Sequence, residues 1–332
     1  MNPEAKNIVT LAAGGGGKVM DRLLSGLILK YFKSPELSRL RDASYITCPE
    51  KAAFCTDSFV ITPEFFPGGD IGKLAVAGTT NDLAVSGAVP LYLSCGLVIP
   101  EGYSMESLER VLASMAEAAE LAGAEIVTGD TKVMPRGELS GLIINTAGIG
   151  RRVYSWNDVS NIKEGDSIII SSDIARHGVA IFLAREELGF KGKIESDCNI
   201  LYPMLKTIEG ADVHFARDAT RGGVAAVLNE ISRATGKGMY LYEKDIPLRE
   251  DVSRFCDTLG FEPLAVANEG AAVIIAKPDG AAAMVEALRR HPAGHNASVV
   301  GTVRGQGVIL ETAIGGKRYV EMPLGEILPR IC

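Results

Sequence analysis

The feature that most constrains the fold of this chain is an alternation of strand-like and helix-like segments that occurs twice, on either side of a polar connection. In the first half, helices are predicted at 18–33, 70–87 and 104–124, and strands at 44–48, 52–61, 91–99, 124–133 and 139–150. In the second half, helices are predicted at 178–188, 224–234 and 281–290, and strands at 167–171, 264–267, 271–276, 298–303 and 307–311. Such alternation is typical of layered α/β domains, in which helices cover a sheet.

The polar connection, residues 151–166, predicts the boundary between two domains, and 332 residues suit about two domains of ordinary size. We expect a glycine-rich segment with a helix over 1–35, an N-terminal domain over 36–155, a C-terminal domain over 156–315 and a tail over 316–332. The tail is charged, contains Pro323 and Pro329 and has few groups to bury, which predicts a mobile terminus.

The net charge of −7 argues against nucleic acid or an anionic membrane as the main partner. It is compatible with a small anion bound through a metal ion, because that attraction is local. The N-terminus lacks the pattern of a signal peptide, and the most apolar stretch, 88–100, is too short to cross a bilayer. These features predict a cytoplasmic protein.

The six cysteines form neither a CxxC pair nor a cysteine–histidine cluster with zinc-site spacing, so we expect free thiols in a reducing compartment. Five of them lie in apolar or strand-like segments and are predicted to be small core residues: Cys48, Cys55, Cys95, Cys198 and Cys256. Cys332 differs, because it is the last residue of the sequence. An oxidisable side chain at the least protected position is either an accident of the terminus or part of the function.

Four consecutive glycines precede Lys18 and suggest a loop whose backbone N–H groups approach a phosphate. The run, Gly14–Gly17, does not fit the phosphate loop of P-loop proteins, because Ala12 stands where a glycine is required and Val19 where serine or threonine is required. A flexible hinge is the alternative interpretation.

Aspartates set among small or apolar neighbours are the stronger signal. Asp57 lies within an apolar strand and Asp82 within an otherwise apolar helix, where a bare carboxylate is costly unless it is paired or bound to a cation. The full set is Asp42, Asp57, Asp82, Asp130 and Asp218. If these converge, their oxygens suit Mg²⁺ and a nucleotide polyphosphate. The alternative is that Asp42 and Asp218 cap turns or helices.

Two further charged residues are candidates for chemistry. Glu269 stands between two apolar segments, where it is either a general base or a turn carboxylate. Lys132 follows Asp130 closely, and it either holds a phosphate or developing negative charge or is an ordinary exposed lysine.

Taken together, these motifs resemble the HypE family of hydrogenase maturation factors, which is related to aminoimidazole ribonucleotide synthetase and selenophosphate synthetase. The resemblance runs nearly end to end through "GGGG", "TDSFV", "FFPGGDIGKLAVAGTTNDLA", "GDTK", "RDATRGG" and "NEG", and it ends with "PRIC". One departure is Ala13, where relatives often have histidine before the glycine run.

The resemblance implies a two-domain fold like that of aminoimidazole ribonucleotide synthetase (PurM-like), α/β with layered α+β domains. It also implies a homodimer formed through the sheet of the N-terminal domain and a flexible C-terminal tail. It implies an ATP·Mg²⁺ site in a cleft lined by the five aspartates, which would be the metal ligands. The implied nucleotide contacts are Gly14, Gly15, Gly16, Gly17, Lys18, Asp57, Asp82, Asp130, Thr131 and Asn145.

The reaction implied by the resemblance gives Cys332 a purpose. The carbamoyltransferase HypF would load a carbamoyl group onto Cys332, and ATP-dependent dehydration would convert this thiocarboxamide to a thiocyanate. The HypC–HypD complex would accept the cyanide for the hydrogenase iron. Glu269 is the hypothesised base for the nitrogen protons, and Lys132 would stabilise charge near the transferred phosphoryl group.

Two alternatives remain open at this point. The first is another ATP-dependent enzyme of the same fold that acts on a free small molecule and does not need Cys332. The second is a non-catalytic thiol carrier, which would not need Asp57, Asp82 or Glu269.

Overall fold

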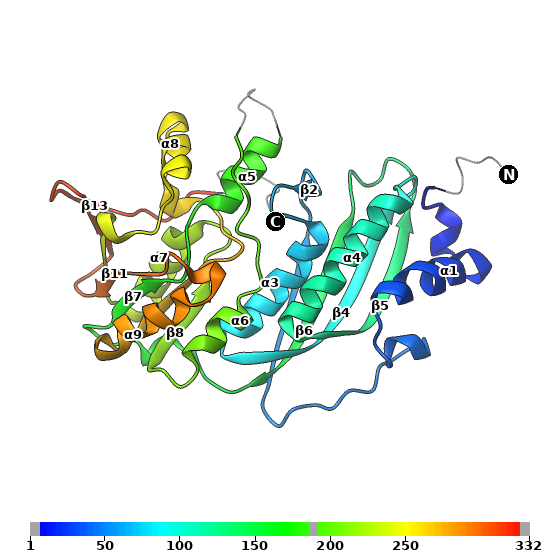
Figure 1. Cartoon of the computed structure of the whole chain (residues 1–332), viewed down its shortest axis with the longest axis horizontal. Helices are drawn as coiled ribbons and strands as arrows, with labels where there is room; N and C mark the ends of the chain where they lie inside the picture. Colours follow the sequence, from blue (N-terminus) through cyan, green and yellow to red (C-terminus); the bar gives the residue numbers. More distant parts are fainter. Residues whose placement is uncertain (1–6, 186–191, 326–332) are drawn as a thin grey trace.

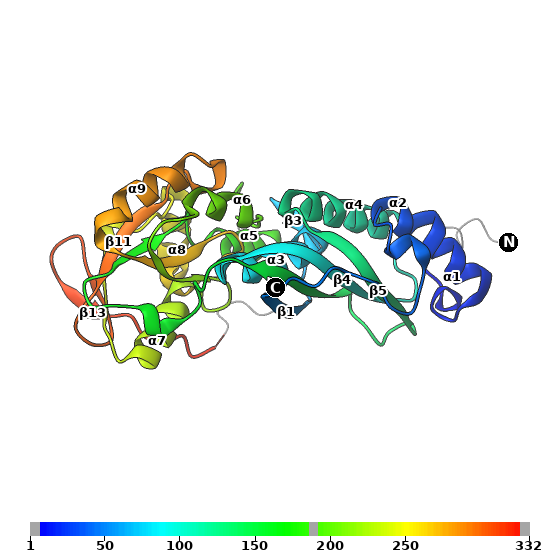
Figure 2. The same ribbon diagram turned by 90° about the horizontal axis from the view of Figure 1, so that it is seen from below.

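The computed structural model describes residues 7–185 and 192–325, which form two layered domains lying side by side (Figures 1 and 2). The two α/β domains expected from the sequence are confirmed. Cys332 lies outside the described residues. Within the described ranges, no helix combines the length and the apolar character needed to cross a membrane.

The N-terminal domain is built on a four-stranded sheet in the order β1-β6-β4-β5. Its strands are β1 (Ala52–Phe59), β4 (Ala88–Pro100), β5 (Glu125–Met134) and β6 (Ile143–Arg152), and only the β4–β5 pair is parallel. Two helices, α3 (Ile71–Val85) and α4 (Met105–Ala122), cover one face (Figure 2). Buried and half-buried residues alternate along β6, so the opposite face of the sheet is left open by the described part of the chain.

The two covering helices begin where the sequence predicts. Asp70 caps α3, because its Oδ1 accepts hydrogen bonds from the backbone N–H groups of Gly72 and Lys73 at 2.7 and 3.1 Å. Ser104 caps α4 in the same way, and Gly123 ends that helix with a φ of 70°. A short hairpin of β2 (Phe65–Phe66) and β3 (Gly69–Asp70) leads into α3.

The segment from Val9 to Phe32 packs on the same face of the sheet as α3 and α4, because its buried residues belong to the same core. The helix predicted at 18–33 is present as α1 (Gly17–Leu23), a π-helical turn η3 (Leu24–Ile28) and α2 (Leu29–Tyr31), preceded by the 3₁₀ turn η2 (Leu11–Gly14). The strand predicted at 44–48 is wrong, because the segment after the 3₁₀ turn η4 (Leu37–Arg39) pairs with no strand. Instead, the Ser44 hydroxyl donates to the Val127 carbonyl of the neighbouring edge strand.

The C-terminal domain contains a seven-stranded sheet in the order β13-β12-β9-β11-β7-β10-β8. The strands are β7 (Ser167–Ile170), β8 (Val213–Asp218), β9 (Met239–Tyr242), β10 (Ala272–Ala276), β11 (Ser298–Val303), β12 (Val308–Glu311) and β13 (Lys317–Tyr319). The helices are α5 (Arg176–Ala184), α6 (Tyr202–Leu205), α7 (Gly223–Thr235), α8 (Glu250–Leu259) and α9 (Pro278–Arg289). Short 3₁₀ turns join them: η5 (Val159–Asn161), η6 (Lys206–Ile208), η7 (Glu243–Asp245), η8 (Pro263–Ala265) and η9 (Pro292–Gly294).

Both faces of this second sheet are covered, which explains its continuous apolar strands. On β7, Ile168 and Ile170 belong to the core shared with α5, α7 and α8, whereas Ile169 belongs to the core shared with α6 and α9. Every residue of β7 and β10 is buried. A strand buried on both sides is almost entirely apolar in sequence, as the runs "SIII" and "AVIIA" illustrate.

Several sequence expectations for the C-terminal half need correction. The strand predicted at 264–267 is the 3₁₀ turn η8 and a following loop, and Pro263 at its start cannot donate to a strand ladder. β8, β9 and α8 were not predicted. The expected tail begins later than residue 316, because β13 pairs with β12 and Val320 is buried in the core.

The cysteines are also only partly as predicted. Cys95, Cys198 and Cys256 are buried, but Cys48 is exposed and Cys55 is half-buried. Cys48 lies in the segment that fails to form the predicted strand, so no sheet position covers it.

Candidate functional site

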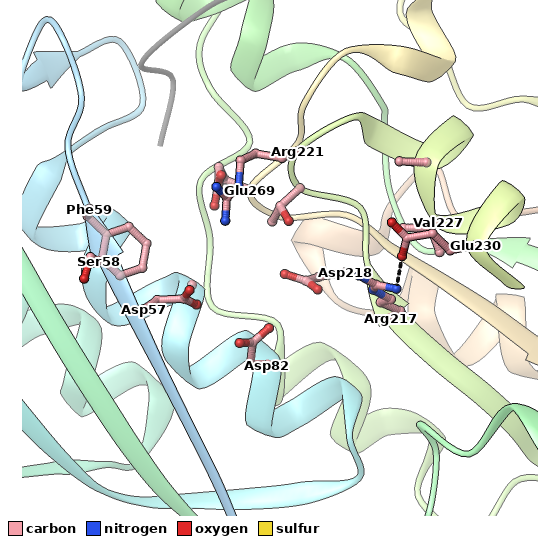
Figure 3. Close-up of a pocket in the computed structure, with 13 residues that line it drawn as sticks. Asp57, Ser58, Phe59, Asp82, Arg217, Asp218, Arg221, Val227, Glu230 and Glu269 are labelled. Carbon is pink, nitrogen blue, oxygen red and sulfur yellow. Dashed lines mark hydrogen bonds and ion pairs between the residues drawn. The ribbon is translucent and has the colours of Figure 1, made fainter. Parts of the chain in front are cut away.

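A cavity of about 240 Å³ lies between the two domains and collects carboxyl groups from both (Figure 3). The N-terminal domain contributes Asp57 from β1 and Asp82 from α3, and the C-terminal domain contributes Asp218 and Glu269. Arg221 also lines the cavity. Four of the residues selected from the sequence therefore lie together, although they are spread over more than 200 positions of the chain.

Strand geometry brings these four groups to one place. Alternation along β1 turns Asp57 toward the helix-covered face, where Asp82 projects from α3. Asp218 is the last residue of β8 and pairs with Ala272 of β10, and Glu269 stands in the loop just before β10. Asp218 caps no helix, because α7 begins after Gly222 without a side-chain cap.

A buried amide on α3 holds the two walls of the cavity together. Asn81 is 2% exposed, its Oδ1 accepts from Leu201 N at 2.7 Å, and its Nδ2 donates to the carbonyls of Asn199 at 2.9 Å and Glu269 at 3.4 Å. Asn81 thus fixes the helix that carries Asp82 against the loop that carries Glu269. The sequence signal that could have identified it is an amide in the middle of an apolar helix.

The loops of the C-terminal domain are held by a second buried amide. Asn268 accepts from Ala175 N at 2.6 Å and donates from Nδ2 to the Ala219 carbonyl at 2.7 Å. Ala175 has a left-handed φ of 68°, a strained conformation for a residue with a Cβ atom. Because Asn268 and Ala219 directly neighbour Glu269 and Asp218, this amide fixes the two carboxyl-bearing segments relative to each other.

Asp197 is a buried carboxyl next to the cavity that the sequence did not suggest. Its Oδ2 accepts from the backbone N–H groups of Glu269 and Gly270 at 3.2 and 3.0 Å, and its Oδ1 has no partner among the described residues. Burial raises the pKa of Asp197 to about 6. Asp197 therefore supports the Glu269 loop and adds negative charge behind it.

Asp82, Asp218 and Glu269 bind protons more tightly than exposed carboxyls do. Burial raises the pKa of Asp82 to about 8, and the charges of Asp218 and Asp57 add to this shift. Burial raises the pKa of Asp218 to about 6, against the opposing effect of Arg217. Arg217 also forms an ion pair with Glu230 on α7. The protein's own cations therefore do not balance the carboxylates.

Glu269 has the least exposed of these side chains. Burial raises its pKa well above the ordinary value, and Asp218, Asp197 and Asp57 raise it further. A glutamate with a raised pKa is a stronger proton acceptor once it has lost its own proton. Its place in the cavity is consistent with the predicted acid–base role, and 3% exposure argues against an ordinary turn carboxylate.

The donor set suits a hard divalent cation. Among the described residues, no group of three metal-ligating side chains is arranged as a ready metal site. Asp57, Asp82 and Asp218 nevertheless offer unneutralised carboxylate oxygens in one cavity, the ligand type that Mg²⁺ prefers. The residues present thus fit the predicted cation.

Apart from Asn145, the other predicted site residues lie toward the opposite edge of the N-terminal sheet. Asp130 and Lys132 are exposed on β5 and alternate with buried Thr131 and Val133, so they point away from the helix-covered face. Two strands separate β5 from β1, a distance of about 14–15 Å. Asn145 lies on β6 beside β1 and donates to the Asp57 carbonyl at 2.8 Å.

The glycine run lies farther still from the cavity, beside β5 and at the end of the molecule remote from the C-terminal domain (Figure 1). A Cβ atom on Gly14 would stand 2.8 Å from Val133 N, so close packing against β5 requires glycine there. Gly16 and Gly17 have φ values of 82° and 71° and turn the chain into α1, and Lys18 is exposed.

Asp42 is exposed and does not line the interdomain cavity. Its neighbour Arg41 lines a second cavity of about 180 Å³ with Asp130 and Thr131. A single cleft lined by all five aspartates is therefore not formed within one chain. Three line the interdomain cavity, and two lie near the β5 edge.

The four buried or half-buried thiols of the described residues are poorly reactive. Burial raises the pKa of Cys55 to about 12, with Asp82 and Asp57 adding to the shift, although this thiol lies beside the carboxyl cluster. Burial also raises the pKa of Cys95 to about 12 and of Cys256 to about 11, and that of Cys198 well above its usual value. A neutral buried thiol is a poor nucleophile.

Comparison with known proteins agrees with this architecture. Residues 41–152 match the family "AIR synthase related protein, N-terminal domain", and residues 163–311 match its C-terminal domain. Carbamoyl dehydratase HypE of Escherichia coli (strain K12) is 44% identical over 336 residues, covering 98% of this chain and 100% of the relative.

Solved structures of the same protein family superpose over most of the chain. A crystal structure of the hydrogenase maturation protein HypE in complex with ATP has a TM-score of 0.93 and 42% identity, covering 97% of this chain and 99% of the other. The HypE chain of a HypE–HypF complex has a TM-score of 0.80 and 39% identity, covering 91% and 99%. This chain therefore belongs to the HypE family of carbamoyl dehydratases, within the AIR synthase related proteins.

Proposed function

We propose that this protein is an ATP-dependent carbamoyl dehydratase of hydrogenase maturation and that its own Cys332 carries the substrate group. The observation that supports this most directly is the interdomain cavity, where the carboxyl groups of Asp57, Asp82, Asp218 and Glu269 outnumber the two arginines that line it, Arg217 and Arg221. A relative more than 40% identical over its whole length is a carbamoyl dehydratase, and another is solved with ATP.

The proposed reaction removes the oxygen of a thiocarboxamide as phosphate. The carbonyl oxygen of S–C(=O)–NH₂ on Cys332 attacks the γ-phosphorus of ATP and releases ADP. The C–O bond then breaks with loss of phosphate and of the nitrogen protons, and S–C≡N remains. In sum, the thiocarboxamide and ATP give the thiocyanate, ADP and phosphate. The elements of water lost by the thiocarboxamide are thus the ones that convert ATP to ADP and phosphate. Phosphate leaves readily, whereas an amide oxygen alone does not.

The cavity residues would have different roles, which follow from their chemistry. Asp57, Asp82 and Asp218 would hold Mg²⁺, which neutralises and aligns a polyphosphate when bound. Glu269, hydrogen-bonded at its backbone to Asp197 and Asn81, would take a proton from the substrate nitrogen. The buried thiols of the fold do not compete with Cys332, because their raised pKa values keep them protonated.

A second copy of the chain would complete the site. Asp130 and Lys132 point from the open face of the N-terminal sheet, and Phe54 on β1 is 70% exposed on the same domain. A two-fold dimer through this face would place the β5 edge of one subunit near the β1 edge of the other. Lys132, Asp130, Thr131 and the glycine run would then serve the partner subunit's cavity.

The partners follow from the reaction. HypF would supply the carbamoyl group, in keeping with the solved HypE–HypF complex, and a HypC–HypD complex would accept the cyanide. The cytoplasm would keep the Cys332 thiol reduced and available.

The test is the mass of the C-terminal peptide after incubation with HypF, its substrates and ATP·Mg²⁺. We expect a carbamoyl adduct on Cys332 that loses the mass of one water only when ATP·Mg²⁺ is present. An unmodified Cys332 beside a HypF preparation active on a control would overturn this proposal and favour an enzyme acting on a free small molecule. Water loss without ATP would contradict the phosphoryl-transfer step.

A further inference from the structure

The chain that follows β13 is fixed to α7 before it reaches the last residues. Val320 is 3% exposed, and its N–H donates to the Val308 carbonyl at 2.9 Å. The carbonyl of Val320 accepts from Nδ2 of Asn229 on α7 at 3.0 Å. The same Nδ2 also donates to the Ala225 carbonyl at 2.9 Å, so the amide is oriented by its own helix.

The segment then runs along α7 toward the start of that helix. Three residues after Val320, Pro323 lies beside Gly222, since a Cβ atom on Gly222 would stand 3.8 Å from Pro323 Cγ. The seven residues from Gly222 to Asn229 rise about 10 Å at 1.5 Å per residue. Three extended residues also span about 10 Å. The two lengths match, which indicates a chain laid antiparallel to α7.

The start of α7 is also where the cavity lies. Asp218, Thr220 and Arg221, in the segment just before α7, line the cavity, as do Ala226 and Val227 of its first turns. The described part of the C-terminal segment therefore runs toward the start of α7, next to the carboxyl cluster, and Leu324 near its end is exposed.

We infer that Asn229 is a positioning residue, which fixes Val320 against α7 and so sets the point from which the chain continues to Cys332. This inference rests on the proposed function, because it concerns the delivery of Cys332. We call the hydrogen bond between Asn229 and Val320 the anchor. With the anchor in place, only the nine residues after Pro323 connect to Cys332, a reach of at most about 30 Å.

The anchor has a quantitative consequence. If β13 and Val320 were released, the free segment would begin after β12 and would contain 21 residues instead of nine. The effective concentration of a tethered group falls roughly as the −3/2 power of tether length, so release lowers that of Cys332 about fourfold. Delivery, and not the chemistry in the cavity, is what the anchor affects.

The experiment compares the same reaction with the substrate attached and with the substrate free. In the attached form, single-turnover dehydration of carbamoylated Cys332 is followed by mass. In the free form, the full-length Cys332→Ala protein acts on a carbamoylated synthetic peptide of residues 325–332. Asn229→Leu should slow the attached reaction, by at most the factor of about four that full release of β13 and Val320 would give, and should leave the free reaction and ATP affinity unchanged. Val320→Ser, a second way to loosen the anchor, should give the same split.

The matched control is Thr235→Val, which removes a hydroxyl bond to the Ile231 carbonyl on the same helix, away from the terminal segment. It should change neither reaction. Equal losses in the attached and free reactions of Asn229→Leu, or full attached rates in both anchor variants, would overturn the inference alone. Failure of the unmodified protein to lose water in either form would overturn the proposed function and this inference with it.

Discussion

The two edges of the N-terminal sheet carry similar residues in opposite environments. At the β1 edge, Asp57 and Asp82 are covered by the C-terminal domain, and burial raises the pKa of Asp82 to about 8. At the β5 edge, Asp130 and Lys132 are exposed, although Asp130 also lines the smaller cavity with Arg41, and the C-terminal domain does not cover them. From the sequence, the two groups were expected to form one site. Within a single chain, however, they lie at opposite edges of the sheet.

The difference shows what burial contributes to a carboxylate site. The second domain removes water from the β1 edge and adds Asp218 and Glu269, so charge accumulates where a cation can neutralise it. The β5 edge has similar chemical groups, but the second domain does not pack against it. Its function therefore depends on what covers it, which we propose to be the second subunit.

The largest effect is expected for Asp82→Asn at the β1 edge. Loss of one carboxylate that faces the phosphates should lower ATP-dependent dehydration by about 10²–10³-fold, as for other preorganised electrostatic groups. The same variant should be more stable than the unmodified protein at pH 8, because it removes a charge that burial disfavours.

The stability difference has a definite sign with pH. The folded pKa of Asp82, about 8, lies above its unfolded value, so the folded protein holds the extra proton and loses stability as pH rises toward 8. Thermal unfolding should therefore show a larger gain for Asp82→Asn at pH 8 than at pH 5. Asp212→Asn, at an exposed carboxylate, serves as the control and should change neither activity nor stability. A variant that kept full activity would remove the β1 edge from the chemistry.

The next effect concerns Mg²⁺ binding, which depends on the protonation of the buried carboxyl groups near the β1 edge. Below pH 6, Asp82 and Asp218 are both protonated, and a cation must displace those protons to bind. The affinity for Mg²⁺ should rise by up to about tenfold per pH unit between pH 6 and 8, and it should level off above pH 8. Calorimetry in two buffers with different ionisation enthalpies should detect proton release at pH 7. A flat affinity over this range would show that Mg²⁺ binds elsewhere, for example at the exposed β5 edge.

The smallest effect tests whether the two edges work together across a dimer. Lys132→Ala and Asp82→Asn should each be inactive alone. If each site combines the β1 edge of one subunit with the β5 edge of the other, mixed dimers contain one intact site and one doubly altered site. Equimolar mixing after subunit exchange should then restore about one quarter of full activity. No recovery, with exchange verified by mass, would place both residues in the same subunit's site.

Local sequence signals predicted most of the N-terminal domain. The caps Asp70 and Ser104 act within three residues of themselves, so their roles could be recognised without the rest of the fold. The failures have a different origin. The segment 44–48 has strand-like residues and lies beside the edge strand β5, but it contacts β5 through the Ser44 side chain and not through a backbone ladder.

The site was predictable in its residues but not in its assembly. Apolar surroundings marked Asp57 and Asp82 as unusual, and the family resemblance supplied their purpose. Asn81, Asp197 and Asn268 were missed because their importance lies in hydrogen bonds to backbone groups far away in sequence, such as the bond from Asn81 to Asn199. No local pattern marks such a partner.

The sequence by itself determined the elements, the two-domain division and the family, because periodicity, capping and motif spacing act over a few residues or are shared with relatives. Only the tertiary structure decided which carboxylates meet, and that Asp130 and Lys132 do not join them within one chain. It also decided that the terminal segment is bound to α7 through Val320. The physical reason is that burial and charge repulsion depend on groups brought together by domain packing, and these groups lie as far apart as Asp57 and Glu269, more than 200 positions along the chain.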